Sequence, residues 1–247
     1  MIAGSVCAAS ASVTYQVNNG GLESFNVQID STKIYGALAG GILINRISSS
    51  DPSMPASYVT VCTDIEGTLY LGQSYKYNTP VTPFAGETGI APTWGLPSDG
   101  SAAAEAIQNA AYLFYTYGQL TSTGVGLGST TLKAALQLAV WEALYNTTAT
   151  GDIISGSGAR FKVTNGDAAA IAQANAWIVA LNGLSDEGNF GLDGYLLTPA
   201  TSHYTDGRPP QGLLIAVPEA PTVIAGALLL LPFAASTLKI LRRKRTA

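Results

Sequence analysis

Residues 130–145 read TTLKAALQLAVWEALY, the most clearly helical stretch of the chain. Within it Gln137, Val140, Trp141, Leu144 and Tyr145 follow the i, i+3, i+4, i+7, i+8 spacing, which places them on one side of a helix facing the core. Gln137 stands at the start of this stripe. A buried primary amide costs a few kcal/mol unless it is hydrogen-bonded. We therefore expect a core helix whose glutamine has a defined partner.

The segments around this helix predict an α+β fold. Apolar spacing and capping residues indicate two further helices, and short runs rich in Val, Ile, Tyr and Leu indicate strands. The strands come first, then the helices, then strands again, so we expect a β-sandwich or barrel with an inserted helical section. The expected helices span 102–117 and 167–181, and the expected strands span 12–17, 25–29, 34–38, 57–65, 195–197 and 213–217.

The charge of the chain is sparse and unevenly distributed. Charged residues make up 11% of the 247 residues, against roughly a quarter in ordinary soluble domains. Five of the twelve Lys and Arg residues lie in the last nine positions, so the chain before them carries seven basic and sixteen acidic residues, a net charge of −9. Such an acidic body argues against nucleic acid as a partner.

The two ends of the sequence indicate export. Residues 222–238 are uncharged and apolar, and the run extends to 241 across Lys239, which is long enough for a transmembrane helix. A basic cluster follows and is expected to stay cytoplasmic; it consists of Arg242, Arg243, Lys244 and Arg245. Residues 1–11 have the small-residue end of a signal peptide without its basic start. The alternatives are a buried C-terminal core helix and an N-terminus without a targeting role.

The C-terminal segment resembles the PEP-CTERM sorting tail of Gram-negative bacteria. The resemblance rests on Val217, Pro218, Glu219 and Pro221, on the apolar run and on the basic end, although Ala220 separates Glu219 from the second proline. It implies export, recognition by the membrane protease-transpeptidase exosortase, anchoring in the inner membrane, and delivery to the cell surface or matrix after processing. The expected organisation is therefore a signal remnant (1–11), an ectodomain (12–216) and a sorting tail (217–247).

A cysteine and the helical glutamine together carry a second resemblance. Cys62 lies on the strand 57–65, where alternation places it on the same face as Tyr58. The segment Gln137-Leu-Ala-Val-Trp141, following this strand-borne cysteine, resembles the thioester domains of bacterial surface adhesins. The family often has Thr where Leu136 stands and an aromatic residue beside the cysteine, and both are absent here.

The resemblance implies an internal Cys62–Gln137 thioester, formed with loss of ammonia and supported by Ala139 and Trp141. Such a bond captures an amine-bearing surface or matrix partner once, without turnover, so we expect an adhesin rather than an enzyme, with no cofactor and no metal. We expect no basic side chain beside either residue to act as a base.

The alternative is a non-covalent structural or biofilm matrix protein in which Cys62 is a thiol and Gln137 a core amide. Two weaker possibilities are a Cys62–His203 hydrolase and a Ca²⁺ site in the acidic loop 186–193.

Overall fold

The computed structural model describes residues 12–52, 54–63, 65, 69–78, 82–83, 100–146, 153–154, 159–184, 195–197, 200 and 211–215. By its internal contacts the chain divides after Ala216, and the fold described below belongs to the first unit. The elements are, in chain order, β1 (Ser12–Ile29), β2 (Thr32–Ser49), β3 (Ser57–Cys62), β4 (Ser74–Asn78), β5 (Thr82–Pro83), α1 (Gly100–Tyr117), α2 (Thr130–Tyr145), β6 (Phe161–Asn165), α3 (Ala168–Asn182), β7 (Tyr195–Leu197) and β8 (Leu213–Ile215).

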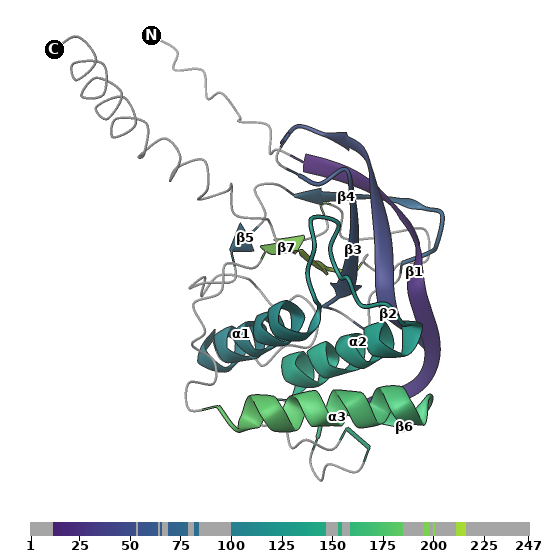
Figure 1. The fold of residues 1–247 in the computed structure, drawn as a ribbon, viewed down its shortest axis with the longest axis vertical. Coiled ribbons are helices and arrows are strands. Elements are labelled where there is room, and N and C mark those ends of the chain that lie inside the picture. The colour runs from purple at the N-terminus through teal and green to yellow at the C-terminus, as the bar shows by residue number, and fades with distance from the viewer. Residues whose placement is uncertain are drawn as a thin grey trace, which may run out of the picture. The chain divides into compact units, whose positions relative to one another are not determined.

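The described strands form one eight-stranded sheet. Its order is β4-β1-β2-β3-β8-β7-β5, and β6 pairs with β1; all of these pairs are antiparallel. The three helices lie together beside the sheet, with α2 between α1 and α3 and against β1 and β2 (Figure 1). Antiparallel sheet with separate helices confirms the expected α+β class.

Strands β1 and β2 form a long hairpin that differs from the expected short strands. Each has 18 residues, and only Asp30 and Ser31 separate them, with Asp30 in the left-handed region at φ 51°. The expected strands 12–17, 25–29 and 34–38 leave Gly20, Gly21, Gly40 and Gly41 in the connections between strands. In the structure they lie inside the strands, where the pairing register shifts between Asn19 and Leu22. The glycines therefore bend the hairpin without ending it.

These glycines bring the backbones of β1 and β2 close to each other and to α2. Gly40 has φ 139°, and a Cβ atom there would collide with the carbonyl oxygen of Gly21. A Cβ atom on Gly41 would lie 2.9 Å from Cδ of Lys133 on α2. Lys133 crosses this flat surface and donates from Nζ to the carbonyl oxygen of Gly20 at 2.7 Å. Because the glycines have no side chains, the start of α2 packs directly against the backbones of β1 and β2.

Helix α2 confirms the expected bounds but not the expected single buried stripe. Ser129 caps its first turn by accepting from the amide of Leu132, and every residue from Ala134 to Tyr145 is buried. The helix is covered all round because α1, α3 and the sheet contact different sides of it. Helix α3 also matches its prediction, since Asp167 caps it by accepting from the amide of Ala169.

The short strand β6 was not predicted. It lies between α2 and α3 in the sequence and pairs with β1 from Asn26 to Ile29, so the helical section is not one uninterrupted insertion. Its five residues alternate only over Phe161, Lys162 and Val163, which is too short for a clear strand pattern. Pairing with the long strand β1 supplies the stability that the local sequence lacks.

None of the helices in the described residues is long and apolar enough to span a bilayer. The predicted signal remnant (1–11) and sorting tail (217–247), including the membrane helix 222–241, lie outside those residues.

The close approach of the β1 and β2 backbones at Gly40 can be tested with Gly40→Ala. This change adds a Cβ atom against Gly21 and forces an L-residue into a positive φ, so we expect the free energy of unfolding to fall by about 2 to 4 kcal/mol in urea denaturation. Gly128→Ala is the matched control, because a Cβ atom there has nothing within 4 Å. Equal stability of the two variants would contradict the close approach.

Candidate functional site

Cys62 is the last residue of β3 and is held by pairing on both edges of the strand. On one edge Val59 bonds through its backbone to Thr123 and Val125, and Cys62 pairs with Leu213 of β8. On the other edge β2 pairs with β3, but this ladder stops at Ile42 and Thr60. Alternation directs the N–H and C=O of Cys62 to this second edge, beyond the end of β2. The strand therefore presents two backbone groups that need partners.

The side-chain amide of Gln137 supplies both partners. The Cys62 N–H donates to Oε1 of Gln137 at 2.8 Å, and Nε2 of Gln137 donates to the Cys62 carbonyl oxygen at 2.7 Å. The amide thus continues the ladder where β2 stops. Gln137 is fully buried and Cys62 is 1% exposed. The structure brings the two predicted residues, which are 75 positions apart, into direct contact.

The same contact places the thiol beside the amide carbonyl. Sγ of Cys62 lies 3.3 Å from Oε1 of Gln137. Because a C=O bond is about 1.23 Å long, Cδ of Gln137 lies within about 4.5 Å of Sγ. The Cys62 N–H already points at Oε1, the atom on which negative charge develops when a nucleophile attacks the carbonyl. Nucleophile, electrophile and a charge-stabilising donor are therefore gathered in one buried place.

Two aromatic residues continue the Gln137 side of α2. Trp141 is 1% exposed and packs edge-on against Phe161 with ring centroids 6.1 Å apart; its indole N–H has no hydrogen-bond partner within the described residues. Tyr145, one turn further, accepts from the amide of Ile65 at 3.2 Å. The segment after β3 is therefore fastened to α2 at Gln137 and Tyr145, with Trp141 between these points on the helix.

Ala139, the other residue of the predicted motif, occupies a different side of the helix. It is fully buried, but residues two apart on a helix do not face the same way, so it is directed away from Cys62. Its small side chain fits the close packing around α2.

A second amide, that of Asn146 at the C-terminal cap of α2, bonds to a strand in the same manner. Asn146 accepts from the amide of Phe161 at 3.1 Å and donates to its carbonyl oxygen at 3.3 Å, and it also donates to Glu142 at 2.8 Å. Asn146 thus attaches the end of α2 to β6 as Gln137 attaches its middle to β3. The Gln137 pair differs from this contact in having the Cys62 thiol beside the amide.

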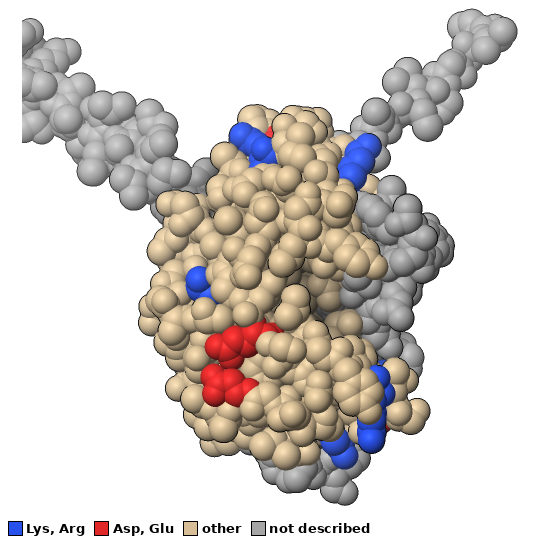
Figure 2. Space-filling model, turned by 90° about the vertical axis from the view of Figure 1, so that its right-hand side faces the viewer, with Lys and Arg blue, Asp and Glu red and all other residues tan. Residues whose placement is uncertain are grey.

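One basic residue, Lys133, lies close to Gln137 in the sequence. Lys133 lies one helical turn before Gln137, at a spacing of four residues that could have been recognised in the sequence. Its ammonium donates to Gly20, on the β1 side of the hairpin, whereas Gln137 reaches to β3. The charged side chains are otherwise few and scattered on the face seen in Figure 2.

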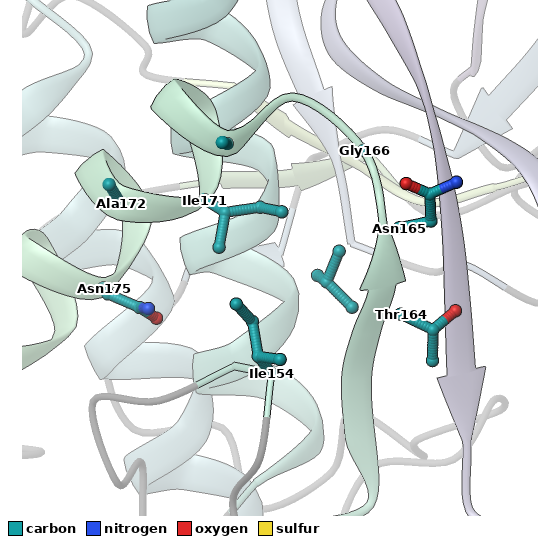
Figure 3. A pocket seen from close by; sticks show the side chains of 9 residues that line it. Ile154, Thr164, Asn165, Gly166, Ile171, Ala172 and Asn175 are labelled. Atoms are coloured by element: carbon teal, nitrogen blue, oxygen red, sulfur yellow. The ribbon is translucent and has the colours of Figure 1, made fainter.

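The remaining candidates do not form a site in the described residues. His203 and the acidic loop 186–193 lie outside them. Within them, no three His, Cys, Asp or Glu side chains gather as metal ligands. An open cavity of about 350 Å³ lies between β6 and α3, where Ile154 and Ile171 are found (Figure 3). Two of the polar side chains that line it, those of Thr164 and Asn175, bond to backbone groups of Asn26 and Ile153 and so serve the fold.

The amide pair can be tested with Gln137→Met in a Cys62→Ser background, where no thioester can form. Methionine keeps the length but removes both hydrogen bonds to residue 62, so we expect the free energy of unfolding to fall by about 2 to 4 kcal/mol in urea denaturation. Gln173→Met on α3 is the control, since this half-buried position should change stability by no more than about 0.5 kcal/mol. If both methionine variants lowered the free energy of unfolding equally, the hydrogen bonds between Gln137 and residue 62 would not contribute to stability.

Comparison with family models, curated proteins and solved structures finds no match for this chain. The likeness to thioester domains and to PEP-CTERM tails accordingly stays a prediction from the residues that carry it.

Proposed function

We propose that this chain is an exported surface or matrix protein whose Cys62 and Gln137 form an internal thioester that captures a partner amine. The observation that carries the proposal is the contact itself: Sγ lies 3.3 Å from Oε1, and the Cys62 N–H donates to the same oxygen at 2.8 Å. The Gln137–Trp141 motif supports the same chemistry. Single-use capture makes the protein an adhesin rather than a turnover enzyme.

Formation of the bond is an acyl transfer within the buried pair. The Cys62 thiolate attacks Cδ of Gln137, and the electron pair of the C=O bond moves to Oε1, where the Cys62 N–H stabilises it. The carbonyl then re-forms, the C–N bond breaks, and the nitrogen leaves as ammonia with the proton that the thiol gave up. The step is redox-neutral and needs no cofactor.

Capture of a partner reverses the same chemistry with a different amine. A primary amine attacks Cδ, the C–S bond breaks, and Sγ leaves as a thiol carrying one amine proton. Until then, burial of both residues and the attachment of residues 62 and 65 to α2 limit access of water to the bond. A protected bond of this kind persists until a suitable amine reaches it.

The proposed location rests on sequence alone. The apolar run 222–241 acts as a membrane anchor, the basic residues after it stay in the cytoplasm, and an exosortase-type enzyme processes the tail at Val217–Pro221. The acidic, sparsely charged ectodomain then reaches the cell surface or the matrix.

One observation favours a non-covalent structural role instead. Both hydrogen-bonding atoms of the Gln137 amide are satisfied by the Cys62 backbone, and Asn146 makes the same contacts with Phe161 and no thiol. In this alternative, Gln137 serves to hold α2 on the sheet, and the protein is a matrix component without a thioester.

Intact mass separates the two functions. We expect the wild-type chain to be lighter than its sequence by one ammonia, because thioester formation releases Nε2 of Gln137. A Cys62→Ser variant should have the mass of its sequence. A wild-type chain that retains its full mass would rule out the thioester and favour the structural role.

Methylamine gives a second measurement on the same site. We expect one methylamine to be added at residue 137, located by fragmentation of the peptide that contains it, and the Cys62 thiol to become alkylatable after denaturation at the same time. Asn146 is an internal control, because it has the same backbone contacts and should gain nothing. Addition at any other position would contradict the assignment to Gln137.

A further inference from the structure

We infer that the backbone carbonyl of Cys62 selects the nucleophile, favouring primary amines over secondary amines and alcohols. The inference rests on the proposed thioester and deepens it. The carbonyl accepts from Nε2 of Gln137 at 2.7 Å, and both residues are buried. The acyl group of residue 137 is also held from its other side, because Oε1 accepts from the Cys62 N–H at 2.8 Å. A nitrogen that takes the place of Nε2 on Cδ therefore faces this carbonyl again.

The site has three states: the amide, the thioester and the product of amine capture. They differ in whether a hydrogen bond to the Cys62 carbonyl exists. In the amide state the Gln137 nitrogen donates it. In the thioester state sulfur takes the place of nitrogen, and the hydrogen bond is lost. When a primary amine attacks, the C–N bond forms, the C–S bond breaks, and one amine proton passes to Sγ. The second amine proton stays on nitrogen and restores the hydrogen bond to the Cys62 carbonyl.

Secondary amines and alcohols cannot restore the bond. A secondary amine leaves a tertiary amide without an N–H, and an alcohol leaves an ester. Water leaves a carboxylic acid, which can donate to the carbonyl only while it is protonated and adds a negative charge to a buried site once it ionises. A missing hydrogen bond at a buried position corresponds to a factor of about ten or more in an equilibrium or rate. The carbonyl thus disfavours capture of a secondary amine or an alcohol.

The restored bond also explains why the pair can be both a structural contact and a reactive one. Capture of a primary amine re-forms the two-bond connection between β3 and α2 that the glutamine makes. The partner becomes attached without leaving the strand end unsupported. A lysine side chain on a partner protein has the required primary amine.

Two isomeric amines test this selection. Ethylamine and dimethylamine have the same formula and give adducts of the same mass, but only the ethylamine product keeps an N–H. The full-length chain that has lost ammonia is incubated with each amine at equal free-base concentration, and adduct formation is followed by mass. Each rate is divided by the rate with a simple alkyl thioester in solution, which removes the intrinsic nucleophilicity. We expect the normalised rate for ethylamine to be at least tenfold higher.

Isopropylamine separates hydrogen bonding from size, because it is a larger molecule than dimethylamine yet keeps an N–H in its product. It should still react faster than dimethylamine after normalisation. A rate as low as that of dimethylamine, or equal normalised rates for all three amines, would overturn selection by the carbonyl while leaving the thioester in place. If the chain retains its ammonia and gives no adduct with any amine, the thioester and the selection are both wrong. Cys62→Ser serves as the control that forms no adduct.

Discussion

The pair of hydrogen bonds between the Gln137 amide and the Cys62 backbone connects the sheet to the helices at one point. Strand β3 continues beyond the end of its pairing with β2, and without a partner the N–H and C=O of Cys62 would be buried and unsatisfied on that edge. A side-chain amide presents an acceptor oxygen and a donor nitrogen side by side, so it can bond to both groups and replace the missing strand. This requirement fixes the position of α2 along the sheet, and it brings a thiol to the amide carbonyl as a consequence.

The approach of α2 to this point depends on the hairpin of β1 and β2. Side chains at Gly40 or Gly41 would collide with the neighbouring backbone or with Lys133, so the glycines allow the helix to lie directly on the strands. At the far end of the helix, Asn146 repeats the amide contact with Phe161 of β6. Helix α2 is thus attached at its start, middle and end, and its complete burial follows from that position.

The low charge of the chain limits the chemistry that the site can use. Lys133 is close in sequence but bonds to Gly20, so the contacts around the pair consist of backbone groups, an amide and aromatic rings. A donor fixed in the backbone stabilises an oxyanion without a formal charge and without reorganisation. The same backbone, through its carbonyl, distinguishes nucleophiles by what they leave on residue 137. The oxyanion donor and the selecting carbonyl belong to the two peptide units that flank Cys62. Neither property needs an ionisable side chain.

Local signals in the sequence determined the helices and the candidate residues. Apolar spacing and the caps Ser129 and Asp167 act within a few residues, so the bounds of α2 and α3 could be predicted closely. Residue type and motif singled out Cys62 and Gln137. Only the tertiary structure decided that the hairpin strands run through their glycines, that β6 exists, and that α2 is buried on all sides. These features depend on partners distant in the sequence, as the existence of β6 depends on its pairing with β1. It also decided that the Gln137 amide completes the ladder at Cys62, because a hydrogen bond between residues 75 positions apart depends on where the whole sheet ends and leaves no local trace.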